Sequence, residues 1–356
     1  MQARASNGSA GAASGSPTVR AIAREAGVSA STVSRVLRSR DGVSADARRR
    51  VMEAIARLGS TPDEVRLSTT RRLRALSRSA AAGARLLALI VPDVSTGFYA
   101  EVLRGVEAEA YERGYTLVLY TTAGRGHDQV VRRALEAGQC DGLIIMTPRG
   151  ESPRTLRQQA GVPLPPVVVV DHRAEGSPYP HIAVDNLKGA IEATNYLIGK
   201  GYRRIAFITG LLTIQSAVDR LRGYRLALEE AGIGFDPAWV IQGDFLTPSG
   251  YRAVKEWLEQ GRPLPDAWFC SNDLMAFGAL KALHEAGISV PGDTAVMGFD
   301  DIPLAQTTLP PLTTVAQPMA EMGALAVRMV VGMIEGGGVA VPRVVLQTRL
   351  VIRESA

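Results

Sequence analysis

The sequence predicts an α/β protein in which a small all-α head precedes a larger core of two lobes. Three observations predict this architecture. The chain has 356 residues, more than one compact core usually holds. Apolar runs of strand length alternate with amphipathic helical segments from Leu86 onward, which is typical of parallel sheets covered on both faces. Before residue 61 only short helical patterns occur, and positive charge is concentrated around them.

Composition excludes a membrane-spanning or a disordered protein. Hydrophobic residues make up 46% of the chain and charged residues 21%, which are globular values. The longest apolar runs, Leu86–Pro92 and Pro166–Val170, are far shorter than the roughly 20 residues that a membrane helix needs. Residues 1–16 have no apolar stretch and are interpreted as a flexible tail, not a signal peptide. Cys140 and Cys270 are predicted to be buried free thiols, as in a reducing cytoplasm.

Charge is distributed unevenly along the chain. From Pro17 to Arg85 there are 15 arginines and no lysine against 6 acidic residues, whereas the rest of the chain carries a small excess of acidic groups. A basic segment joined to a mildly acidic body indicates a module that binds a polyanion. The alternative, an ordinary solvated charged face, leaves the localisation of the charge unexplained.

Residues 17–60 are predicted to form three short helices. Ser29 and Ser44 stand at N-cap positions, and Gly27 and Gly42 mark turns. The apolar residues have the spacing of a helix-turn-helix, at Ile22, Ala26, Val28, Val33 and Val36. The second helix, predicted over residues 30–38, would then bury its valines and present its polar face to a DNA major groove.

The residues expected to contact DNA lie on and around that second helix. Arg35 is the best candidate for reading a base, because a guanidinium can bond bidentately to guanine. Hydroxyl side chains suit phosphates, which position a protein on DNA without specifying the sequence. The predicted set in the head is Thr18, Ser29, Ala30, Ser31, Thr32, Ser34, Arg35 and Arg38.

The core, residues 86–356, follows a linker over residues 61–85 that is rich in Arg, Ser and Ala. Strands are predicted at residues 86–92, 116–121, 142–146, 167–171, 181–184, 204–209, 240–244, 267–271 and 294–299. Helices are predicted at residues 99–113, 127–137, 153–160, 186–200, 216–231, 248–259 and 273–286. So many units predict two Rossmann-like lobes, in which ligands bind outside the carboxyl ends of the strands.

Polar residues lie where several of these strands end or where helices open. Carboxylates, an amide and a guanidinium can bind the hydroxyls of a polyol, and aromatic rings can cover its apolar face. The predicted effector-binding set is Asp171, Arg220, Asn272 and Asp300, with the aromatic residues Phe98, Tyr99 and Phe245. Simpler roles remain open: Asp171 and Asp300 could only shape turns, Asn272 and Asp273 could only cap a helix, and Tyr99 could be core or dimer interface.

The segment Thr18–Leu37 (TVRAIAREAGVSASTVSRVL) resembles the head of the lactose-repressor (LacI/GalR) family of bacterial transcriptional regulators. Downstream motifs agree in order, among them PDVSTGFYAEVLRGVE, DGLIIM, RLRGYRLAL, FCSNDLMAFGAL, VMGFDD and PPLTTVAQP. The resemblance runs from Thr18 to Arg353. It implies a cytoplasmic, nucleoid-associated regulator without membrane attachment, expected to be a repressor. It would bind double-stranded, pseudo-palindromic operator DNA as a homodimer under the control of a small-molecule effector.

The resemblance also implies a core like that of periplasmic binding proteins. Crossovers are expected near Asp185, Gln317 and Leu346, so lobe 1 would hold residues 86–184 and 317–345, and lobe 2 residues 185–316 and 346–356. Ala30, Ser31 and Arg35 align with the family's base-contacting positions, and all seven predicted effector residues match positions of its effector pocket. Because the chain stops at Ala356, with no further helix for a tetramer, a dimer is favoured.

One departure from the family concerns the hinge, where a leucine wedges into the minor groove. The stretch from Pro62 to Pro92 is longer here than in typical members. Leu73 or Leu76 is the favoured wedge, because arginines surround both. A linker that becomes ordered only on DNA is an equally good interpretation.

Three other functions were weighed. A purine-type, corepressor-dependent regulator is disfavoured because Ile214 stands where that branch has a purine-contacting arginine, so a sugar or sugar derivative is the predicted effector. A sugar-binding transport protein should begin with a signal peptide. An enzyme could use Asp171 and Asp300 as a glycosidase pair, but residues 124–126 (GRG) lack the rest of a phosphate loop. No catalytic residue, cofactor or metal site is predicted, since the four histidines lack metal-ligand spacing.

Overall fold

The computed structural model describes residues 19–37, 44–62, 65, 85–122, 129–131, 134, 140–146, 164–171, 179–336 and 343–356. The chain divides into two compact units, residues 1–84 and 85–356. The predicted helices over residues 127–137 and 153–160 lie mostly or wholly outside the described residues, as does nearly all of the linker with Leu73 and Leu76.

The first unit contains three helices, α1 (Val19–Ala26), α2 (Ala30–Leu37) and α3 (Ala45–Arg57). Their shared core is apolar and fully buried, and its largest members are Ile22, Val33, Val36, Val51 and Ile55. The predicted caps form: the Ser29 Oγ accepts from the backbone N–H of Thr32, and the Ser44 Oγ accepts from that of Ala47. The predicted three-helix head is therefore present.

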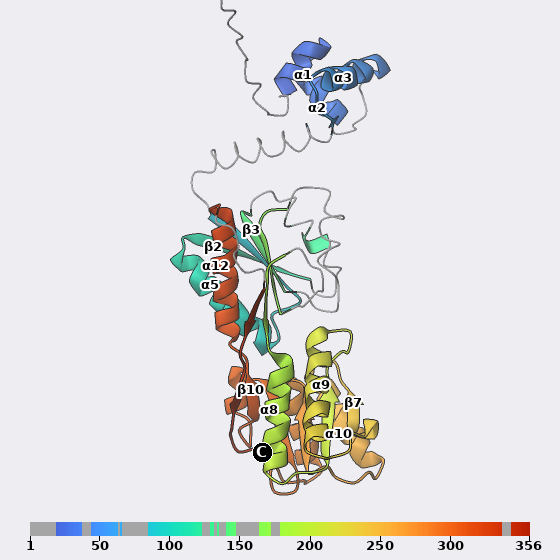
Figure 1. Cartoon of the computed structure of the whole chain (residues 1–356), viewed down its shortest axis with the longest axis vertical. Coiled ribbons are helices and arrows are strands. Elements are labelled where there is room, and N and C mark those ends of the chain that lie inside the picture. Colours follow the sequence, from blue (N-terminus) through green and yellow to red (C-terminus); the bar gives the residue numbers. More distant parts are fainter. Residues whose placement is uncertain are drawn as a thin grey trace, which may run out of the picture. The chain divides into compact units, whose positions relative to one another are not determined.

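Lobe 1 of the second unit is built on a parallel sheet of six strands in the order β11-β5-β4-β3-β1-β2. The strands are β1 (Arg85–Val91), β2 (Tyr115–Thr121), β3 (Gly142–Met146), β4 (Val167–Val170), β5 (His181–Val184) and β11 (Arg343–Leu346). Each central strand is a continuous apolar run and is buried on both faces, as in the four valines of β4. Helices α5 (Gly97–Glu112) and α12 (Met319–Ile334) lie side by side on this lobe (Figure 1).

Lobe 2 repeats the plan with a sheet in the order β12-β10-β9-β8-β6-β7. Its strands are β6 (Ile205–Thr209), β7 (Val240–Gln242), β8 (Ala267–Cys270), β9 (Ala295–Asp300), β10 (Thr313–Ala316) and the antiparallel β12 (Arg349–Val351). Its helices are α8 (Asn186–Gly199), α9 (Gln215–Glu230), α10 (Thr247–Glu259) and α11 (Asp273–Glu285), with 3-10 turns η1 (Pro237–Trp239) and η2 (Pro303–Gln306). Helices α8 and α9 pack together, as do α10 and α11.

The chain passes between the lobes three times, after β5, after β10 and after β11. These crossovers fall near Asp185, Gln317 and Leu346, the positions that the family resemblance implies. Two of them are tied together, because the Asp185 N–H donates to the Leu346 carbonyl at 3.0 Å. The lobes also touch through apolar side chains, since Ile302 of lobe 2 is buried in the core cluster of lobe 1. The predicted two-lobed α/β architecture is therefore confirmed.

The structure corrects two smaller expectations. No disulfide joins Cys140 and Cys270, but only Cys270 is fully buried, whereas Cys140 is half-buried. Periodicity alone did not predict β10, α12, β11 or β12. None of the described helices combines the length and the apolar composition needed to cross a membrane.

Candidate functional site

A cavity of about 150 Å³ lies between the two lobes, at the carboxyl ends of their strands. All seven predicted effector residues line it. Further lining comes from residues that the sequence did not single out, among them Thr96, Leu211, Ser216 and Gln317. The convergence follows from topology, because the carboxyl ends of parallel strands meet at one edge of each sheet.

The backbone around the cavity is strained. Four non-glycine residues in the described chain have a positive φ, and three of them line the cavity: Asp171 at 69°, Phe245 at 71° and Asp300 at 125°. An L side chain in this region costs free energy that the surrounding packing must offset. Asp171 and Asp300 stand where β4 and β9 end, and both line the cavity between the lobes.

Arg220 is the centre of the site's electrostatics. It lies in the second turn of α9, not at the helix opening as the sequence suggested, and is only 3% exposed. Its Nε donates to the Asn186 Oδ1 at 2.8 Å, and its Nη1 donates to the Ser271 carbonyl. The same Nη1 is 3.6 Å from the Asp300 Oδ1. The guanidinium also lies 3.8 Å from the centre of the Phe299 ring, a cation–π contact.

Buried carboxyl groups surround this arginine. Burial raises the pKa of Asp171 to about 6, although Arg220 opposes the shift. Burial likewise raises the pKa of Asp300 to about 7, against the opposing effects of Arg220 and Gln317. The pKa of Asp273 behind them is also raised, by burial and by the nearby Asp300. Around neutral pH the site can therefore offer both a protonated carboxyl that donates a hydrogen bond and a carboxylate that accepts one.

Three buried polar atoms of cavity-lining residues have no hydrogen-bond partner within the described protein: Thr96 Oγ1, Asp171 Oδ1 and Gln317 Oε1. The Nε2 of the same Gln317 donates to the Asp300 Oδ1 at 2.6 Å, which fixes the direction of its amide. A buried polar atom without a partner costs about 1–3 kcal/mol. A ligand hydroxyl group that reached any of these atoms would remove its share of that cost.

Asn272 caps a helix, which is one of the two roles that the sequence left open. Its Oδ1 accepts from the Met275 N–H and caps α11, and its Nδ2 donates to the Phe245 carbonyl at 2.9 Å. Asn272 therefore holds Phe245 in place, and the Phe245 ring packs directly on Gly210, where an added Cβ would overlap it. Across the cavity, the rings of Phe98 and Tyr99 meet edge to face with centres 5.4 Å apart.

The residues that sequence reasoning missed do not directly follow a predicted strand; Gln317 comes directly after β10, which periodicity did not reveal. Gln317 was recognised only as part of a crossover, and Thr96 only as part of a family motif. Asn186 follows Asp185 at the start of α8, and its contact with Arg220 joins residues 34 positions apart. No local sequence pattern predicts such a hydrogen bond. The polar residues at the crossovers, Asp185, Asn186 and Gln317, could nevertheless have been chosen as candidate site residues.

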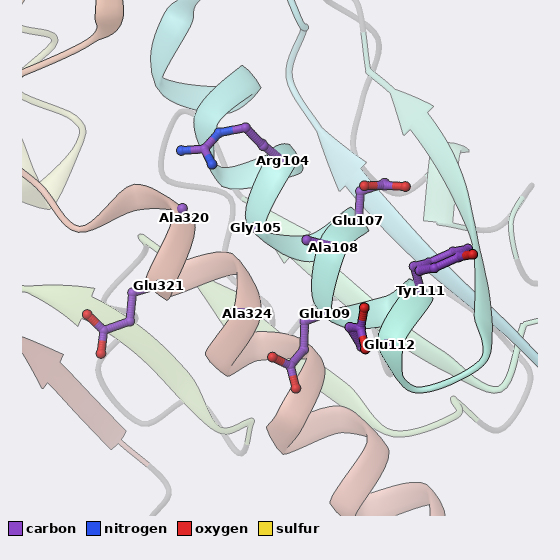
Figure 2. Close-up of a pocket in the computed structure, with 10 residues that line it drawn as sticks. All are labelled: Arg104, Gly105, Glu107, Ala108, Glu109, Tyr111, Glu112, Ala320, Glu321 and Ala324. Atoms are coloured by element: carbon purple, nitrogen blue, oxygen red, sulfur yellow. The ribbon is translucent and has the colours of Figure 1, made fainter.

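A second, larger hollow of about 640 Å³ lies on the surface of lobe 1, along α5 and α12 (Figure 2). Small residues make its floor: Gly105, Ala108, Ala320 and Ala324. Its polar groups do not converge, since Figure 2 shows Glu107 and Tyr111 pointing away from α12. Glu109 is already paired with Arg113 and Arg328, at 2.6 and 2.9 Å. The hollow therefore lacks the features of a small-molecule site.

The head shows part of its predicted DNA-contacting set. Arg35 is exposed on α2. The Ser29 and Thr32 hydroxyl groups are 2.8 Å apart, and Ser29 also caps α2, so this pair shapes the helix start. Thr18, Arg38, Leu73 and Leu76 lie outside the described residues, and the side chains of Ala30, Ser31 and Ser34 are not described.

Comparison with known proteins gives consistent matches along the chain. The model of "Bacterial regulatory proteins, lacI family" matches residues 18–63, and the "Periplasmic binding protein-like domain" matches residues 194–356. The repressor CytR of Escherichia coli K12 is 33% identical over 95% of this chain and 96% of its own length. The ribose operon repressor of Escherichia coli K12 is 38% identical over 88% of this chain and 92% of its own length.

Two solved structures are also similar. The regulator CelR in complex with cellobiose has a TM-score of 0.68 at 35% identity, covering 96% of this chain and 100% of its own. The Lac repressor dimer bound to operator and the anti-inducer ONPF has a TM-score of 0.69 at 27% identity, covering 95% and 98%.

Proposed function

This chain belongs to the lacI family of bacterial regulatory proteins and is a DNA-binding transcriptional repressor, not an enzyme; we propose that a neutral sugar of about monosaccharide size controls it from the cavity between the lobes. The observation that carries this proposal is the set of three buried, unpartnered polar atoms that belong to cavity-lining residues, on Thr96, Asp171 and Gln317. A polyol supplies several hydroxyl groups, each of which both donates and accepts hydrogen bonds.

Charge supports a neutral ligand. Among the described residues that line the cavity, Arg220 is the only cation, and four carboxyl groups accompany it: Asp93, Asp171, Asp244 and Asp300. Arg220 is already engaged by protein acceptors. A phosphate ester would bring further negative charge to a site with a carboxyl excess, and this disfavours sugar phosphates and nucleotides.

Size and shape support a small ligand. The cavity volume of about 150 Å³ is below the roughly 300–1,000 Å³ of sites for drug-sized ligands. Phe98, Tyr99 and Phe245 supply apolar faces against which sugar C–H groups can pack. Ile214 also lines the cavity, so a purine would meet an aliphatic side chain there and not a guanidinium. A ribose operon repressor and a cellobiose-bound regulator among its relatives agree with a sugar effector.

The DNA-bound form that we propose is a homodimer on a pseudo-palindromic operator, acting in the cytoplasm at the nucleoid. The similar Lac repressor structure is a dimer on its operator. Large apolar side chains on lobe 2 are left in solvent by the single chain, in particular Leu304 at 54% and Leu309 at 93% exposure. An association of two chains through these side chains would remove them from water, which is favourable. In each head Arg35 would read a base and the hydroxyls of Ser29 and Thr32 would face phosphates.

Control of DNA binding would follow from closure of the lobes around the sugar. The three crossovers allow the lobes to change their angle, and a ligand that contacts both lobes favours the closed state. A 100-fold change in operator affinity requires a differential binding free energy of about 2.7 kcal/mol. Hydrogen bonds between the sugar and the unpartnered polar groups of the cavity-lining residues can supply a free energy of this size.

The test combines ligand binding with DNA binding in the full chain. Thermal unfolding is measured with D-ribose, D-glucose, cellobiose, ribose 5-phosphate and adenosine, because a ligand of the native state raises the melting temperature. The ligand that does so is then added to the chain bound to a duplex selected from randomised pseudo-palindromes. We expect a neutral sugar to stabilise the chain and to change its affinity for the duplex. Stabilisation by cellobiose, ribose 5-phosphate or adenosine only, or by none of the five, would reject the proposal of a neutral sugar of monosaccharide size.

A further inference from the structure

The turn between α1 and α2 is tied down by hydrogen bonds from within. Gly27, at φ +62°, ends α1: its N–H donates to the Arg24 carbonyl, and the Val28 N–H donates to the Ala23 carbonyl. This pair of bonds is a Schellman motif, which satisfies two of the carbonyls that a helix leaves free at its carboxyl end. The Ala26 and Gly27 carbonyls, closest to the recognition helix, are not satisfied by it.

Arg50 of α3 binds those two remaining carbonyls. Its Nε and Nη2 donate to the Ala26 oxygen at 2.9 and 2.7 Å, and its Nη2 also donates to the Gly27 oxygen. An added Cβ at Gly27 would lie 2.8 Å from that Nη2, so glycine serves the turn both by its positive φ and by leaving room for the guanidinium. The positive charge also faces the negative end of the α1 dipole.

The contact joins all parts of the helix-turn-helix. Arg50 belongs to α3, and the carbonyls that it binds belong to the end of α1 and to the turn. Its Nη1 also lies 3.8 Å from the Asp46 Oδ2 of its own helix. Helix α2 begins at Ala30, three residues after Gly27. Val51, the next residue, is buried in the core shared by the three helices, so the backbone that carries Arg50 is fixed. The planar guanidinium spans two carbonyls, a geometry that the ammonium of lysine cannot reproduce.

We propose that Arg50 is a positioning residue for operator recognition: it clamps the turn from α3 and so sets the direction in which α2 presents its base-reading side chains. The proposal depends on the DNA binding of the head, but not on the identity of the effector. It differs from the usual role of an arginine in a DNA-binding head, which is to contact a phosphate. Arg50 remains partly exposed, at 44% of its side chain, so the two roles must be separated by experiment.

Salt dependence and sequence preference separate the two roles. A phosphate contact strengthens binding to every duplex, and its loss lowers the slope of log affinity against log salt by about 0.9 per contact. A positioning contact acts through the base readers, so its loss weakens the selected duplex and leaves the slope unchanged. Arg49 provides the matched control, because it is the neighbouring arginine and its ion pair is with the exposed Asp46 of the same helix. Both arginines contact Asp46, so the two variants differ in the bonds from Arg50 to the turn carbonyls.

The experiment uses the full chain with a duplex that it selects from randomised pseudo-palindromes and with a scrambled duplex of equal composition. For Arg50→Ala we expect about 10- to 100-fold weaker binding to the selected duplex, less than about 3-fold weaker binding to the scrambled one, and an unchanged salt slope. Arg49→Ala should weaken both duplexes equally and slightly. Arg50→Lys should recover only part of the preference for the selected duplex, because lysine restores the positive charge but not the planar guanidinium that binds two carbonyls.

Other results would overturn the proposal. Equal losses on both duplexes with a lower salt slope for Arg50→Ala would make Arg50 a phosphate contact. Full recovery of the preference by Arg50→Lys would show that charge alone is required, and this result is decisive even if Arg50→Ala fails to fold. A wild-type chain that selects no duplex would refute DNA recognition itself, which is a different failure.

Discussion

Replacement of Asp171 by asparagine tests the chemistry of the cavity most directly. The change keeps the shape of the side chain and removes its ability to ionise. Asp171 follows β4 at a positive φ, its Oδ1 is buried without a partner, and burial raises its pKa from 3.8 to about 6. The folded state therefore holds a carboxyl group that is reluctant to ionise.

The sign of the effect follows from proton binding. Between about pH 4 and pH 6 the folded state keeps the Asp171 proton that the unfolded chain has lost, so stability falls as the pH rises through this window. Above pH 6 the destabilisation is complete. A pKa difference of roughly two corresponds to about 3 kcal/mol, an upper limit for what asparagine can recover. The substituted side chain must still place its amide, so we expect a gain of about 1–3 kcal/mol at pH 7.5 and about a third of that gain at pH 4.5, where part of the window has been crossed.

The assay is thermal unfolding of the full chain, followed by circular dichroism at both pH values with and without the sugar. The Asp171→Asn variant should melt several degrees higher than wild type at pH 7.5. It should also lose most of the stabilisation by sugar, because the acceptor has changed. Glu256→Gln, which neutralises an exposed carboxyl group on α10, should alter neither quantity. A variant less stable than wild type at pH 7.5, or one with unchanged sugar binding, would refute the reasoning.

Three further outcomes are expected. Sugar affinity should rise between pH 5 and pH 8, because sugar hydroxyl groups donate to the ionised carboxylates of Asp171 and Asp300, whose pKa values are about 6 and 7. Titration calorimetry measures the affinity, and an affinity independent of pH would show that neither group binds the sugar. Arg220→Ala should abolish the sugar response and lower the free energy of unfolding by about 3–5 kcal/mol at pH 8. The loss of stability should be smaller at pH 5.5, where the carboxyl groups around Arg220 are protonated. Urea unfolding at both pH values measures this, and a loss independent of pH would contradict it. Gly210→Ala should displace the Phe245 ring and weaken sugar binding about tenfold in the same calorimetric assay, and unchanged affinity would remove that ring from the site.

Matched controls exist for the last two changes. Arg222 lies two residues from Arg220 on α9 and is exposed, so Arg222→Ala should leave both the sugar response and its pH dependence unchanged. Gly234 has open space around its position and an ordinary φ, so Gly234→Ala should leave sugar affinity unchanged. An effect of either control as large as that of its partner would indicate a general loss of stability.

The residues of the cavity were predictable to the extent that they follow strands. Asp171 and Asp300 end buried apolar runs, and the rule that parallel strands end at one edge of a sheet was enough to bring them together. The family resemblance, and not periodicity, placed the three crossovers. The pairing of β11 with β5 joins the end of the chain to a strand about 160 residues earlier, and no local pattern predicts it. The pairing of β12 with β10 was not predicted because periodicity indicated neither strand.

The hydrogen-bond partners of the side chains were harder to predict from the sequence than the positions of the site residues. That Asn272 caps a helix was foreseen, but its second bond, to the Phe245 carbonyl, depends on the strained turn at Phe245. Arg50 carried no signal at all, since in the sequence it is one of three consecutive arginines on a helix. Its partners lie 23 and 24 residues earlier and meet it only when the three helices pack.

Several energetically unfavourable features occur together in the cavity, and a bound ligand can relieve them. Strained turns at Asp171 and Asp300, raised carboxyl pKa values and unpartnered polar atoms all occur within one site. Gln317 belongs to this group and lies just before α12, which crosses α5 so closely that an added Cβ at Gly105 or Gly323 would overlap the opposing backbone. Because such a crossing cannot slide without clashes, we expect α12 and α5 to move as one body when a sugar engages Gln317. Lobe 1 follows the DNA-binding head in the sequence. A movement of α5 and α12 as one body would therefore couple sugar binding to the part of the chain that binds the operator.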